Sequence, residues 1–191
     1  ALALGLGVIG YHVASYLDFE GLNHISAQLE RMILYIYPTF VAALAWLIHK
    51  ERPTRRLILA LLAAYAGVAL VFGHDLSLEG DQVIKGSLLV LASALAFAVY
   101  VNGSKGPIAT LGPPLFTSIA MIGAIVTLCI QFALTRDVTS ALSSLSADVW
   151  WLALVMAIFA TVIPSLLVSE GIARLGPSSA AVIGGIGPIA T

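Results

Sequence analysis

The stretch Ser26–Ile48, SAQLERMILYIYPTFVAALAWLI, decides the fold class of this chain. From Met32 to Ile48 it carries no charged residue. The length of this apolar run is close to the about 20 residues that a helix needs to cross a bilayer. Glu30 and Arg31 stand side by side near its start, where an ionisable group at membrane depth is costly. We therefore predict a transmembrane helix that carries a charged pair near one end.

The composition of the whole chain agrees with a membrane location. Of its 191 residues, 60% are hydrophobic and 10% are charged, and the mean hydropathy is +1.01. Soluble proteins average about 45–50% apolar and about 25% charged residues. A net charge of −1 leaves no basic field for nucleic acid, and the single Cys129 cannot form a disulfide within the chain. We predict an integral, multi-pass protein of a bacterial inner membrane.

Seven segments are apolar enough to be membrane spans. Their apolar runs are continuous rather than alternating, which indicates helices and not the strands of a barrel. The expected fold class is all-α, a polytopic membrane helix bundle. Short connections are expected between the spans, among them 105–114 and 171–176, and the basic residues of 49–56 place that connection on the cytoplasmic side. The predicted spans are Leu2–Phe19, Ile25–Ile48, Leu57–Phe72, Gly86–Ser104, Leu115–Leu134, Val149–Ser169 and Pro177 onward.

An internal repeat emerges when the chain is shifted by 150 residues. Glu20-Gly21 then falls on Glu170-Gly171, and Pro38 falls on Pro188. The shift corresponds to five spans per repeat, an odd number, so the two repeats are expected to be inverted in the membrane, as in many secondary transporters. The repeats predict ten spans in the complete protein, two before residue 1 and one after residue 191, of which this chain would hold about seven.

Several motifs resemble those of the EamA group of the drug/metabolite transporter superfamily. The resemblance covers essentially the whole chain, including SALAFAVYVNGSK and the stretch GPSSAAVIGGIGPIAT at Gly176–Thr191. It implies that residues 1–73 are the last three helices of a first EamA repeat. Residues 86–191 would be the first four helices of a second repeat, with the fourth cut short. The motif residues of the first repeat are Ser26-Ala27, Pro38, Val41–Ile48, Glu51-Arg52 and Gly67-Val68.

The resemblance implies a carrier that moves small metabolites by alternating access, and many members of the group export amino acids or related compounds. We predict a secondary transporter, an exporter of small polar metabolites such as amino acids, with a non-transporting membrane scaffold or accessory protein as the alternative. No nucleotide-binding loop or His-Glu-x-x-His helix occurs in the sequence, so no enzyme activity, cofactor or metal is expected. The expected partners are the lipid bilayer and a small solute, without nucleic acid, and a homodimer is left open.

Six polar or aromatic side chains within the predicted spans are candidates for the substrate pathway. Neighbouring residues on a helix point about 100° apart, so Glu30 and Arg31 are expected to pair with other groups rather than with each other. The alternative is that Arg31 reaches the outer headgroups while Glu30 stabilises the first helical turn. A scaffold should scatter these side chains to the interfaces, whereas a carrier should gather five of them around one cavity, namely Glu30, Arg31, Tyr35, Ser15 and Tyr100. The six candidates are Glu30, Arg31, Tyr35, His12, Ser15 and Tyr100.

Some of these candidates have a structural interpretation as well. His12 is either a proton site or a hydrogen-bonded packing residue, and Tyr35 either contacts the substrate or packs near the interface. Prolines are predicted to kink their helices, and glycines are predicted to allow close helix approach. These kink and packing residues are Pro38, Pro188, Gly184 and Gly185.

Overall fold

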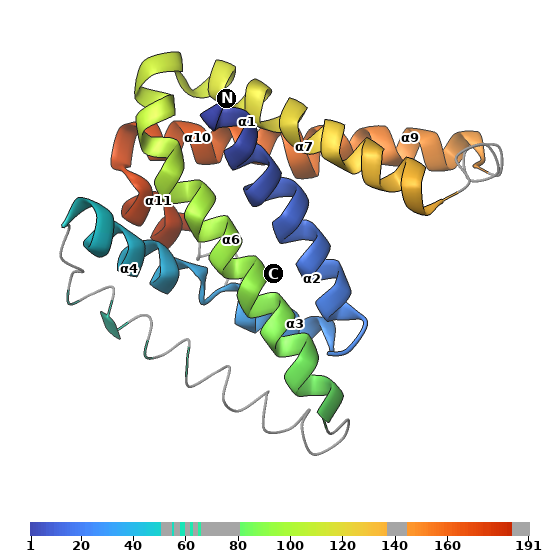
Figure 1. Cartoon of the computed structure of the whole chain (residues 1–191), viewed down its shortest axis with the longest axis horizontal. Coiled ribbons are helices and arrows are strands. Elements are labelled where there is room, and N and C mark those ends of the chain that lie inside the picture. The colour runs from blue at the N-terminus through green and yellow to red at the C-terminus, as the bar shows by residue number, and fades with distance from the viewer. Residues whose placement is uncertain are drawn as a thin grey trace.

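The computed structural model describes residues 1–50, 81–136 and 145–184, together with five isolated positions between 55 and 65. Within these ranges every regular element is a helix (Figure 1). Five helical segments are long and apolar enough to cross a membrane, which confirms the predicted all-α multi-pass bundle. The third predicted span lies largely outside the described residues. The five segments are Leu2–Leu22, Ala27–Ile48, Gln82–Leu111, Pro113–Thr135 and Ala147–Leu175.

The first two spans are each built from more than one helical piece. The first consists of α1 (Leu2–Gly7), the π-helical turn η1 (Val8–Val13) and α2 (Ala14–Leu22). The second consists of α3 (Ala27–Leu34) and α4 (Tyr37–His49). The Ser26 hydroxyl caps α3 by accepting a hydrogen bond from the Leu29 backbone N–H at 3.2 Å. A break at Tyr35 and Ile36 separates α3 from α4, so this span is not a straight rod.

The second half of the chain begins with two long helices that are separated by the single residue Gly112. It consists of α6 (Asp81–Leu111), α7 (Pro113–Thr135), α9 (Ala147–Met156), η2 (Ala157–Val162), α10 (Ile163–Leu175) and α11 (Pro177–Gly184). The helix α6 has 31 residues and is about 45 Å long, at about 1.5 Å per residue. The hydrocarbon core of a bilayer is only about 30 Å thick. The helix can therefore carry Lys85 and Lys105 near the two membrane surfaces.

The predicted connections 105–114 and 171–176 are wrong, because each is a single glycine. The sequence Leu-Gly-Pro occurs at both places, with Gly112 at φ 78° and Gly176 at φ 81°. Glycine adopts such positive φ values without a steric penalty, and proline is well suited to the first position of the next helix. The prediction from hydropathy ended each helix where its apolar run stopped. In the structure both helices continue beyond that run, up to the glycine.

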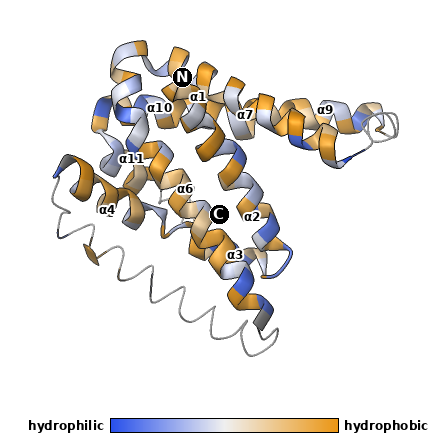
Figure 2. Ribbon diagram, viewed as in Figure 1, coloured by the Kyte–Doolittle hydropathy of each residue, from blue (hydrophilic) through white to orange (hydrophobic). Residues whose placement is uncertain are grey.

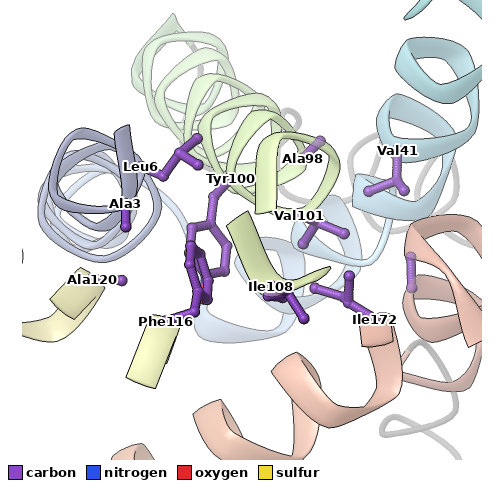
Figure 3. Close-up of a cluster of buried hydrophobic side chains, with 11 residues drawn as sticks. Ala3, Leu6, Val41, Ala98, Tyr100, Val101, Ile108, Phe116, Ala120 and Ile172 are labelled. Atoms are coloured by element: carbon purple, nitrogen blue, oxygen red, sulfur yellow. The ribbon is translucent and has the colours of Figure 1, made fainter. Parts of the chain in front are cut away.

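The long helix α6 is the centre of the bundle and contacts α1, η1, α2, α3, α4, α7, α10 and α11 (Figure 1). The main apolar core forms around it, and Figure 3 shows the rings of Tyr100 and Phe116 next to each other within this core. Both side chains have 0% exposure. At the crossing of α1 and α7, a Cβ atom on Gly7 would lie 1.8 Å from the Ala120 carbonyl oxygen. Small residues thus let these two backbones touch.

Buried polar side chains join the helices by hydrogen bonds. The Ser93 hydroxyl of α6 donates to the Ala14 carbonyl at 2.8 Å, and the Asn102 amide donates to the Val41 carbonyl at 3.1 Å. Large hydrophobic side chains are exposed along α4, α7 and α9. Figure 2 shows that hydrophilic residues gather at the turn between α2 and α3. No residue of α9 or η2 is buried. This distribution is the one expected of a bundle that faces lipid.

Candidate functional site

A cavity of about 660 Å³ lies between the first span, α7 and η2. Most of its wall is aliphatic or aromatic, which is typical of small-molecule sites, and a few polar groups are placed within it. Among the described residues that line it, none is acidic and Arg136 has the only permanent positive charge. The polar lining includes Tyr11, His12, Ser15, Gln131, Arg136 and Thr161.

Both π-helical turns contribute to the wall of this cavity. Tyr11 and His12 come from η1, and Thr161 and Val162 come from η2. These two pairs are related by the same shift of 150 residues that brought out the internal repeat. Single π-helical turns inside α-helices occur frequently at functional sites. Two π-helical turns from distant parts of the chain therefore face one space.

Two predicted pathway residues, His12 and Ser15, line this cavity, and a third lies directly behind it. Tyr100 has 0% exposure and is not part of the lining. Its hydroxyl oxygen is 3.1 Å from that of Tyr11, and the two rings meet edge to face with centroids 5.0 Å apart. Tyr100 therefore reaches the cavity only through Tyr11.

Glu30 and Arg31 lie at the α2–α3 end of the bundle, away from this cavity. The expectation that they would not pair is wrong, because Arg31 Nε is 3.7 Å from Glu30 Oε2. Both side chains are long enough to converge although they leave the helix in different directions. Glu30 is only 4% exposed, and the Asp18 carboxyl of α2 lies beside it. The Arg31 side chain is 67% exposed.

The remaining candidates are placed in other parts of the bundle. Tyr35 is half-buried in the break between α3 and α4, and Pro38 is the second residue of α4. A Cβ atom on Gly184 would lie 2.5 Å from the Tyr37 hydroxyl, so α4 and α11 approach closely there. Gly185 and Pro188 lie outside the described residues. The structure thus does not gather Glu30, Arg31 and Tyr35 with Ser15 around one cavity.

Several site residues were missed by the sequence prediction. Tyr11, Gln131 and Thr161 line the cavity. Outside this site, the Tyr37 hydroxyl joins α4 to α11 by donating to the Ala181 carbonyl at 2.8 Å. The sequence offered a signal for one of them, because Tyr11 and Ser15 follow i, i+4 spacing and share a helical face. Within the described ranges, no group of three or more His, Cys, Asp or Glu side chains could hold a metal ion.

The five apolar spans and the helical bundle define an integral, multi-pass membrane protein. The model of the EamA-like transporter family matches residues 1–73 and 84–191. The chain belongs to this family, of the drug/metabolite transporter superfamily, as the sequence motifs had indicated.

The chain is also similar to curated transporters. It is 30% identical to the uncharacterized transporter YcbK of Bacillus subtilis and 28% identical to the uncharacterized transporter YyaM of the same organism. These comparisons cover 99% and 97% of this chain, and 61% of the length of either relative. An uncharacterized transporter of Archaeoglobus fulgidus is 31% identical over 63% of this chain and 41% of its own length. No solved structure matches the chain.

Proposed function

We propose that this chain forms the larger part of a secondary transporter that exports small polar metabolites, such as amino acids, by alternating access. The observation that carries the proposal is the cavity of about 660 Å³ whose wall includes both π-helical turns. Secondary transporters commonly bind substrate at the interface of two structural repeats near the middle of the membrane. Export is the direction found in many members of the family that the motifs resemble.

The proposal includes two inverted repeats, with residues 1–73 in the first and 86–191 in the second. The elements support this division. η1 and η2 have six residues each and begin 149 positions apart, at Val8 and Ala157. α3 and α11 begin 150 positions apart, at Ala27 and Pro177. Hydrophobicity alone does not require a π-helical turn at matched places, so the coincidence favours a common repeat.

The pathway residues have different roles in this proposal. His12 and Ser15 offer hydrogen-bonding groups in the cavity itself. Glu30, Arg31 and Tyr35 lie toward the α2–α3 end of the bundle and would contact the solute at another stage of its passage. The break in the backbone between α3 and α4, followed by Pro38, gives the second span a place to bend during that passage.

A non-transporting scaffold is the second candidate. The positions of Glu30, Arg31 and Tyr35 away from the cavity favour it, because a carrier was expected to gather these side chains around one cavity. The Glu30 carboxylate is also already paired with Arg31 at 3.7 Å and needs no substrate. The cavity is evidence against a scaffold, because a scaffold does not need polar groups around a space of this size.

Transport by the complete natural protein in proteoliposomes tests the proposal. We would measure efflux of labelled L-leucine, L-methionine, L-glutamate and L-lysine from vesicles that contain the wild type, Glu30→Gln, Arg31→Gln or Ser15→Ala. Flux of any of these solutes that is lost in Ser15→Ala supports a carrier with its site in the cavity. Loss in Glu30→Gln or Arg31→Gln extends the pathway to the α2–α3 end. No flux of any of the four in the wild type would favour the scaffold.

A further inference from the structure

One residue of the cavity wall, Tyr11, is held in place by a residue that does not line the cavity. Tyr11 lines the cavity, and its hydroxyl lies 3.1 Å from the hydroxyl of Tyr100. The two rings make an edge-to-face contact at 5.0 Å and 62°, the arrangement that aromatic pairs prefer. The Tyr11 side chain is thus held by both its ring and its oxygen atom.

Tyr100 has no freedom to move away from this contact. Its ring stacks on Phe97 at 5.8 Å and on Phe116 at 6.0 Å, and its exposure is 0%. On the side of η1, the ring lies directly against Gly10, where a Cβ atom would be 2.3 Å from Tyr100 Cγ. The close approach of η1 and α6 therefore depends on the absence of a side chain at Gly10.

The Tyr11 hydroxyl keeps hydrogen-bonding capacity beyond its bond to Tyr100. Each hydroxyl has one donor and two acceptor positions, and the bond between the two oxygens uses one donor and one acceptor. Tyr11 can therefore still bind a polar group of a solute. In a wall that is otherwise mostly apolar, a polar group left without a partner is penalised, so such a hydroxyl discriminates between solutes.

The remainder of the wall restricts the class of solute. The rings of Tyr16, Phe19 and Phe132 and the aliphatic side chains of α7 surround the same space. Among the described lining residues, no carboxylate is available to accompany a cation, and Arg136 would repel one. The cavity fits a solute with an apolar body and a polar end that is neutral, zwitterionic or anionic.

We propose that Tyr11 is the specificity-determining hydrogen-bonding residue for such a solute, and that Tyr100 is the positioning residue that holds it. The inference rests on the proposed function for the identity of the site as a solute pathway. It places Tyr100 behind the pathway wall, where it acts on the solute only through Tyr11.

Equilibrium binding and transport together test this inference with the complete protein. Binding of labelled L-leucine, L-methionine and L-lysine would be measured by scintillation proximity for the wild type, Tyr11→Phe, Tyr100→Phe and the double variant. The matched control is Tyr37→Phe, which removes a different partly buried hydroxyl, one that joins α4 to α11. Elution as a single peak in size-exclusion chromatography verifies that each variant is folded.

We expect leucine and methionine to bind the wild type and lysine not to bind. Each single variant at Tyr11 or Tyr100 should raise the Kd about two- to tenfold, the effect of one hydrogen bond. The double variant should bind no more weakly than Tyr11→Phe, because Tyr100 acts only through Tyr11. In vesicles the same variants should raise KM and retain kcat, and Tyr37→Phe should change neither the Kd nor KM.

Several results would contradict the inference or the proposed function. Failure of leucine and methionine to bind, or an unchanged Kd in Tyr100→Phe, would overturn the inference. Additive effects in the double variant would also overturn it, since the two residues would then act separately. Binding that responds as expected without any vesicle flux would refute the proposed transport function and leave the Tyr11–Tyr100 assignment standing.

Discussion

Substitution of Gly7 by alanine tests the crossing of α1 and α7, where the two backbones are in contact. The new Cβ atom would lie 1.8 Å from the Ala120 carbonyl oxygen, whereas ordinary contact begins at 3.4 Å. The backbone of α7 cannot rotate out of the way as a side chain could. The helices α1 and α7 would therefore have to separate by about 1.6 Å, and overpacking of this kind costs about 1–3 kcal/mol.

Gly5 provides a matched control on the same helix, because a Cβ atom added there meets nothing within 4 Å. Alanine is favoured over glycine inside a helix by about 0.5–1 kcal/mol, and both substitutions share this gain. The difference between Gly7→Ala and Gly5→Ala therefore isolates the steric cost. At about 2–4 °C per kcal/mol, Gly7→Ala should melt about 2–12 °C below Gly5→Ala.

The assay is thermal unfolding of the purified complete protein in detergent, followed by the fraction that elutes as a folded peak in size-exclusion chromatography. Equal melting temperatures for the two variants would refute the reasoning. Such a result would mean that α1 and α7 do not cross at backbone contact, and the wall of the cavity that α7 provides would need to be placed elsewhere.

Three other substitutions test the remaining features. Tyr37→Phe removes a 2.8 Å hydrogen bond to a carbonyl of α11. It should lower the unfolding free energy by about 0.6 kcal/mol, the average for such bonds in membranes. An unchanged melting temperature would contradict this contact. Gly112→Ala places a side chain at φ 78° and should cost about 1–3 kcal/mol, whereas Gly106→Ala, which meets no atom within 4 Å, should not destabilise the fold. In a cysteine-free background, Ser15→Cys should react with a maleimide because Ser15 lines the cavity. Ala98→Cys should be protected, because Ala98 has 0% exposure. Equal reactivity of the two variants would argue against the cavity.

The arrangement of membrane spans could be predicted from the sequence because hydrophobicity is a local property. The run from Met32 to Ile48 has to be covered by lipid or protein whatever surrounds it, and a helix is the simplest way to satisfy its backbone there. The helix ends were harder to predict from hydrophobicity. Gly112 and Gly176 end their helices through backbone conformation and not through polarity. The hydropathy pattern therefore does not show the helix ends that the sequence Leu-Gly-Pro marks.

The candidate site was only partly predictable. His12 and Ser15 were found because they are polar residues in the middle of a predicted span. Glu30 and Arg31 stood out as charged residues near one end of a predicted span, but their position relative to the cavity depends on how α2 and α3 pack. Tyr11 shares a helical face with Ser15 but was not chosen, because helical spacing does not tell whether that face meets lipid, a core or a cavity.

The sequence by itself determined that this protein is an all-α membrane bundle of the EamA-like transporter family, because composition and short motifs require no knowledge of distant contacts. Only the tertiary structure decided which residues share a space. Tyr11 and Tyr100 are 89 positions apart in the chain, and η1 and η2 are 149 positions apart, yet each pair contributes to one site. Contacts at such separations arise from the packing of whole helices. That packing depends on the shapes of many side chains together, including the absence of a side chain at Gly7 and Gly10.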